Sequence, residues 1–269
     1  MPLLKRFYQD PYLHIRSFAL HLLASAVLCA LLYNIRPPEF FSYSFAWWHP
    51  LLILPAIYIG GLSAVFIHNA CHGSFKPRWM NVVAGEVAGI HQLWGFMGWK
   101  LIHLMHHHYS DDLRYDPHPP ADYTFMQFMK HMFLKSSQKV TERYREHYGE
   151  TKRTIILHRI LKPVFLAMAA CNVLFWFFLL GPALFLWLYV PSYLFNHWIF
   201  SHVNYYSHPK DENGKTYAVN RDDTLYTKLG NLLWFGLYYH GNHHRKPLLF
   251  NPKKMVENPP REKRERLAA

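Results

Sequence analysis

The hydrophobic residues of this chain gather into long uninterrupted runs, and the polar residues gather between them. A helix needs about 20 residues to cross a bilayer core that is roughly 30 Å thick. Four runs are long enough: about Ser17 to Asn34, about Pro50 to Ile67, about Pro163 to Leu180, and about Pro182 to Phe200. The pattern therefore predicts an all-α membrane protein with about four transmembrane helices, the last two joined by a tight hairpin.

Two shorter apolar stretches carry polar interruptions. They run from about Val82 to Ile102, which includes Glu86, and from about Leu225 to Tyr239, which includes Lys228. Such stretches favour interfacial or half-buried helices, although the first could also cross the bilayer. No internal repeat or composition break divides the chain, so residues 1–269 are expected to form a single domain.

Cationic residues lie outside the apolar runs. The formal net charge is +12, from 29 Lys and Arg against 17 Asp and Glu, and the cations concentrate at 114–162 and 210–266. This distribution indicates basic loops between membrane spans rather than a nucleic-acid surface. The positive-inside rule predicts a multi-pass protein whose N-terminus, 114–162 segment and C-terminus are cytoplasmic. The three cysteines form no CxxC pair, so neither a disulfide framework nor a zinc ribbon is indicated.

Histidines form three clusters, "HNACH" at 68–72, "HLMHHH" at 103–108 and "HGNHH" at 240–244. Residues three and four apart share one helix face, so the imidazoles of each cluster can aim at a common point. Converging imidazoles would repel one another if protonated and lose hydration if buried, and a bound cation removes both costs. The candidate ligands are His68, His72, His103, His106, His107, His240, His243 and His244, with His197 and His202 as a further pair near the end of the fourth run.

The histidine clusters predict a bound metal, but they do not identify which metal it is. Imidazole nitrogen suits zinc, copper, iron and nickel. A single zinc ion takes about four ligands, so eight or more converging histidines suggest two metal ions that share the set.

The order of these motifs resembles the integral-membrane fatty acid desaturase superfamily, the histidine-box diiron enzymes. The resemblance rests on "HNACH", "HLMHHHYSDDLRYDPH", "FSHVNYYSHP" and "FGLYYHGNHHRKP", and covers about Ala64 to Pro247. It implies four spanning helices and a cytoplasmic cap in which three histidine boxes hold two iron ions. His202 then matches the additional ligand that acyl desaturases place at the end of the fourth helix.

Two features of the resemblance leave alternatives open. The second box can also be aligned as His103, His107 and His108, so His108 is either an alternative ligand or a neighbour of the metal. Acyl desaturases often carry an Asn four residues before the fourth-helix ligand, but Trp198 occupies that position before His202. His197 therefore competes with His202 for this role.

The family resemblance also implies the chemistry. Its members are oxidoreductases that use two iron ions, with O2 as co-substrate, to attack an unactivated C–H bond of a lipid, and a fatty acyl desaturase is the first expectation. The alternatives are a hydroxylase, ketolase or decarboxylase acting on an alkane, a free fatty acid or a carotenoid, and a zinc-dependent membrane hydrolase. No catalytic residue beyond the metal ligands is expected. The chain lacks a His-Pro-Gly-Gly heme motif, so a separate ferredoxin, rubredoxin or cytochrome b5 type donor should supply electrons.

Overall fold

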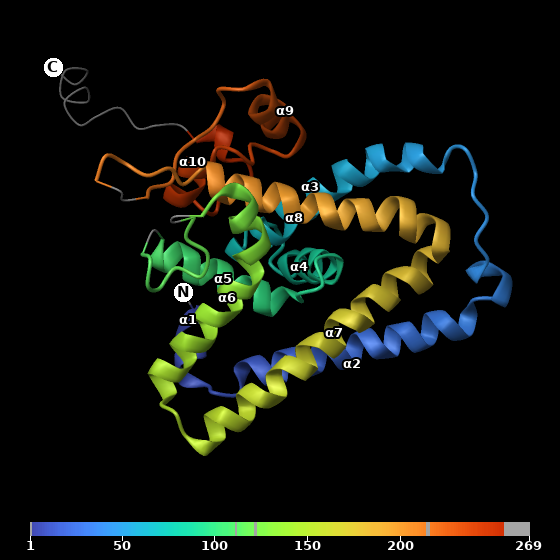
Figure 1. Ribbon diagram of the computed structural model, residues 1–269, viewed down its shortest axis with the longest axis horizontal. Coiled ribbons are helices and arrows are strands. Elements are labelled where there is room, and N and C mark those ends of the chain that lie inside the picture. Colours follow the sequence, from blue (N-terminus) through green and yellow to red (C-terminus); the bar gives the residue numbers. More distant parts are fainter. Residues whose placement is uncertain (1, 111, 121–122, 214–215, 256–269) are drawn as a thin grey trace.

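The computed structural model describes residues 2–110, 112–120, 123–213 and 216–255 (Figure 1). This part of the chain is helical and contains no strand. The helices are α1 (Pro2–Gln9), α2 (Leu13–Ile35), α3 (Ile53–His72), α4 (Met80–His91), α5 (Phe96–Tyr109), α6 (Phe125–Tyr148), α7 (Lys152–Leu184), α8 (Val190–Tyr206), α9 (Leu225–Leu233) and α10 (His240–Arg245). Short 3-10 helices are η1 (Pro38–Phe41), η2 (His49–Leu52) and η4 (Pro252–Lys254), and η3 (Phe185–Tyr189) is a π-helix between α7 and α8.

Among the described residues, three helical segments are long and apolar enough to cross a membrane: Leu13–Ile35, His49–His72 and Lys152–Tyr206. The third segment has 55 residues and contains both of the last two predicted spans. It bends at Gly181, whose φ of 73° lies in the left-handed region that residues other than glycine rarely adopt. The turn therefore lies where the sequence predicted a hairpin, and the number of bilayer crossings stays a prediction.

The long helices pack in two pairs that diverge from this turn. Helix α2 lies along α7, and α3 lies along α8, so that the pairs form a wedge with α4 between them (Figure 1). Helices α3 and α8 approach closely because Gly60 faces the backbone of α8, where the Asn196 amide donates to the Gly60 carbonyl oxygen at 2.9 Å. Small residues allow this kind of contact between membrane helices.

The stretch from Val82 to Ile102 does not form one long helix. Helix α4 ends at His91, and α5 begins at Phe96 after a turn in which Leu93 and Gly95 have positive φ angles of 64° and 66°. At 12 residues, α4 is about 18 Å long, which is shorter than the bilayer core. Helix α9 is also short and exposes Leu225 and Leu232, as an interfacial helix would.

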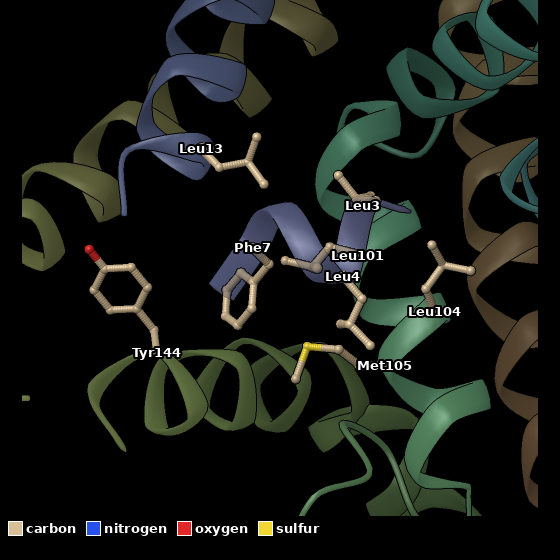
Figure 2. Packing of buried hydrophobic residues seen from close by; sticks show 8 residues of the cluster. All are labelled: Leu3, Leu4, Phe7, Leu13, Leu101, Leu104, Met105 and Tyr144. Atoms are coloured by element: carbon tan, nitrogen blue, oxygen red, sulfur yellow. The ribbon is translucent and has the colours of Figure 1, made fainter. Parts of the chain in front are cut away.

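A helical cap covers the open end of the wedge. Helix α1 inserts Leu3, Leu4 and Phe7 against α5 and α6 (Figure 2). The Tyr148 hydroxyl donates to the Phe7 carbonyl oxygen at 2.7 Å. This packing holds α5, which carries the second histidine cluster, at the mouth of the wedge. The C-terminus, predicted to be cytoplasmic, lies outside the described residues.

Candidate metal centre

Three helices carry the histidine clusters to one place in the cap. The first cluster forms the last turn of α3, which ends at Gly73 in the left-handed conformation with a φ of 79°. The second cluster occupies the C-terminal half of α5, and the third forms α10. Each cluster is helical, as the spacing predicted, but the imidazoles sort into two groups rather than one.

The first group, called here the five-histidine group, places one nitrogen from each ring within 4.8 Å of the others; it contains His68, His72, His103, His107 and His243. The Nε2 atoms of His72 and His103 are 2.8 Å apart. Those of His107 and His243 are 2.9 Å apart. The second and third clusters thus each contribute only some of their histidines to the five-histidine group.

The second group, called here the four-histidine group, contains His106, His208, His240 and His244, again with nitrogens within 4.8 Å of one another. His240 Nε2 lies 3.1 Å from His208 Nε2 and 3.1 Å from His244 Nε2. The two groups adjoin, because the rings of His107 and His244 stack with centroids 4.4 Å apart.

Both groups fit metal ions by geometry and by chemistry. Two nitrogens that bind one ion at about 2.1 Å, at right angles, lie about 3 Å apart, which matches the Nε2 separations. Burial, followed by the neighbouring imidazoles, lowers the pKa of His103 and His243 well below its usual value. These rings are therefore neutral and can each offer a lone pair to a metal. All donors are imidazole nitrogens, a set that suits iron, zinc, copper or nickel rather than magnesium or calcium.

A buried carboxylate orients one of these rings. His106 Nδ1 lies 3.0 Å from both carboxylate oxygens of Asp116, and the side chains are each 1% exposed. Burial and the neighbouring His118 lower the pKa of His106, so the neutral ring donates its Nδ1 proton to Asp116. His106 Nε2, which is buried and has no hydrogen-bond partner, keeps its lone pair for the four-histidine group. Asp116 had no role in the sequence-based interpretation.

Among the predicted ligands, His202 is not in either group. Its Nδ1 lies 2.8 Å from the Tyr238 hydroxyl, and its ring packs on those of Trp198 and Tyr226. His197, its competitor, and His108 are also in neither group, and His108 is exposed.

His208, which the sequence-based interpretation did not name, is a member of the four-histidine group. It follows the end of α8 at Tyr206, six residues beyond His202, and is 2% exposed. Asn204 precedes it by four residues, which is the spacing that Trp198 failed to provide for His202. The Asn204–His208 spacing is therefore a signal in the sequence that points to His208, which lies beyond the last apolar run.

The comparisons with known proteins agree with this arrangement. A family model described as fatty acid desaturase matches residues 45–250, which include both histidine groups. The chain belongs to the fatty acid desaturase family. The searches of curated proteins and of solved structures each returned no match. Membership of the desaturase family makes the protein an enzyme of the desaturase and hydroxylase type, associated with membranes and with a lipid substrate.

A cavity of this desaturase-family protein lies near the five-histidine group. It has a volume of about 530 Å³, lies between α2, α5, α6 and α7, and is lined by apolar side chains such as Phe18 and Phe165. A smaller cavity of about 20 Å³ is lined by His103 and shares Trp94 and Ile102 with the larger one. A long apolar molecule in the larger cavity would meet the five-histidine group behind these two side chains.

Proposed function

We propose that the protein is an O2-dependent diiron oxidoreductase that desaturates a fatty acyl chain. The observation that carries the proposal is the adjoining pair of histidine groups, joined by the stacked rings of His107 and His244. Nine imidazoles exceed the four ligands of one zinc ion, which argues against a zinc-dependent hydrolase. Family membership supports iron among the metals that imidazole suits.

In this proposal one iron ion is held by the five-histidine group and the other by the four-histidine group. His208 takes the place that the family resemblance gave to His202. The iron pair, when bound, supplies the activation of O2 and the removal of hydrogen from the substrate carbon. The protein supplies rigid ligands, with His106 fixed by Asp116, and a largely apolar cavity that ends at Trp94 and Ile102, beside the smaller cavity lined by His103.

The proposal includes a topology and an electron source. The protein is a multi-pass integral membrane enzyme, with the N-terminus and the metal centre on the cytoplasmic side. The cation-rich segment at 114–162 and the cap that contains it support this orientation. A separate carrier of the ferredoxin, rubredoxin or cytochrome b5 type delivers the electrons.

Metal analysis and lipid profiling test the function. The purified protein should contain two iron ions per chain, and the acyl chains of an expressing host should gain a double bond, as measured by mass spectrometry. One zinc ion and no iron would overturn the diiron assignment. A hydroxylated or ketonised product would replace desaturation with the hydroxylase or ketolase alternative.

A matched pair of variants tests the ligands. His107→Ala should abolish the product and lower the iron content while membrane insertion persists. His147→Ala should change neither, because His147 is an exposed residue of α6 whose imidazole interacts with the Tyr8 carbonyl oxygen. Full activity of His107→Ala would refute the assignment of the five-histidine group.

A further inference from the structure

The cavity of about 530 Å³ has one polar end. Most of its wall is aromatic or aliphatic, but between α6 and α7 it is lined by Ser137, His158 and Lys162. Ser137 and Lys162 are exposed, whereas Phe18 and Leu101, also in the wall, are buried. The polar end is therefore the mouth, and the apolar interior extends from it to Trp94.

The mouth opens on the flank of a candidate membrane span. Lys162 lies within Lys152–Tyr206, and Leu166, one turn further along α7, also lines the cavity and is 56% exposed. A lysine near the end of a membrane helix extends its ammonium group to the headgroup region while its stem stays in the apolar layer. A leucine exposed beside it faces acyl chains, so the mouth is at the boundary between headgroups and hydrocarbon.

Among the residues in the described part of the chain that line the cavity, Lys162 is the one lysine or arginine. No carboxylate of the described residues forms an ion pair with Lys162. His14, which also lines the cavity close to His158, has a buried Nε2 atom without a hydrogen-bond partner. The anionic head of an amphiphile gives the Lys162 ammonium group a counter-ion, whereas an uncharged alkane or carotenoid gives it none.

We propose that the cavity binds a single acyl chain that enters sideways from the bilayer, with its anionic head group, a carboxylate or a phosphate, held at the mouth by Lys162. The chain extends along Phe165 and Ala169 towards Trp94 and Ile102, behind which His103 lies. This inference rests on the proposed function for the fate of the chain. Binding itself requires neither metal nor turnover, so it can be tested separately.

Photo-crosslinking to the purified protein, without O2 or an electron donor so that no turnover occurs, tests the inference. The protein in nanodiscs is labelled with a palmitic acid that carries a diazirine on its chain, and the labelled residues are mapped by mass spectrometry. Labels should fall on the cavity wall around Trp94, Phe165 and Ala169. Palmitate should compete with the probe about fivefold better than its methyl ester, the factor that corresponds to about 1 kcal/mol for one lysine near a headgroup surface.

Variants identify the head-group contact. Lys162→Gln should make palmitate and its methyl ester equal competitors. Lys152→Gln should keep the preference, because Lys152 is an exposed lysine of the same helix outside the cavity lining. Ala169→Trp should abolish labelling of the wall by filling the cavity, with an unchanged thermal midpoint confirming that the variant is folded.

The outcomes separate this inference from the proposed function. Equal competition by palmitate and its methyl ester in the unmodified protein, or labels confined to other surfaces, would overturn the inference even if iron and product are present. Iron loss with normal crosslinking would overturn only the proposed function. Competition by palmitoyl lysophosphatidylglycerol supports the inference with a phosphate head, and competition by palmitate alone supports it with a carboxylate head.

Discussion

Replacing Asp116 by Asn should weaken the binding of one metal ion and leave the other unchanged. In the native protein both Asp116 oxygens lie 3.0 Å from His106 Nδ1, and the His118 backbone N–H also donates to Asp116 Oδ1 at 3.0 Å. An Asn amide group in the position of Oδ2 would face the Nδ1 proton with a second donor. The imidazole then moves its proton to Nε2, where it occupies the lone pair that the metal needs.

The size of the effect follows from the hydrogen bond that is lost. A hydrogen bond to a charged partner contributes about 1.5–3 kcal/mol and a neutral one about 1 kcal/mol. The difference of about 0.5–2 kcal/mol corresponds to an affinity loss of about two- to thirtyfold, which overlaps the range of about 10–100-fold for outer partners of metal ligands. We therefore expect about a tenfold weaker affinity at the four-histidine group.

Iron titration against a competing chelator measures the two binding steps. One step of Asp116→Asn should shift by about tenfold while the other coincides with that of the unmodified protein. Asp112→Asn is the control, because Asp112 is exposed and caps the backbone N–H groups of Arg114 and Tyr115 in the same loop. Two unchanged steps, or equal shifts in both, would refute the role of Asp116.

Three further predictions concern the fold and the ligands. His208→Ala should reduce the iron content from two ions to about one per chain by elemental analysis, and His202→Ala should retain both ions. The reason is that His208, unlike His202, has its Nε2 3.1 Å from a nitrogen of another candidate ligand, His240. The reverse result would restore His202 as the ligand. Gly60→Ala should lower stability by about 1–3 kcal/mol in thermal unfolding, because the added methyl group would overlap the Ser192 carbonyl oxygen; an unaltered midpoint would contradict the close packing. Burial lowers the pKa of His91 from its ordinary value of 6.5 to about 4. Between these two pH values the unfolded chain binds a proton that the folded chain does not. The free energy of unfolding should therefore fall, as the pH falls from 6.5 to about 4, by up to roughly 1.4 kcal/mol per pH unit from this residue. His91→Gln should reduce this slope in unfolding measurements, because other buried histidines such as His103 and His243 keep their contributions. An identical slope would exclude His91 as a source.

Helical periodicity explains why most ligand candidates were identified from the sequence and why their division into two groups was not. Residues four apart differ by about 40° around a helix and stay together: His103 with His107, and His240 with His244. A residue three positions on lies about 60° to the other side of the first, and His106 accordingly joins the opposite group. The spacing alone predicted that the histidines of each cluster share one helix face. It could not show that the histidines of one cluster belong to two different groups.

Residues outside the helices were harder to predict. His208 follows the end of α8, and Asp116 lies in the loop after α5, so neither shares a helical period with the other ligands. Their positions depend on how the cap folds. His91, in the apolar stretch from Val82 to Ile102, is buried, and its Nε2 lies 2.8 Å from the Ser192 hydroxyl. A polar residue within an apolar stretch has few other stable environments.

The assembly of the five-histidine group from α3, α5 and α10 has a consequence for how the protein persists in a cell. His107 and His243 are 136 residues apart in the chain, and a metal ion bound by both closes a loop of that length. Constraining a long loop disfavours the unfolded chain much as a disulfide does, and ligands that bind only the folded state stabilise it further. Iron supply would then govern the lifetime of the polypeptide as well as its turnover number. Iron starvation should expose the segment between α8 and α10 to proteases before the membrane helices are lost.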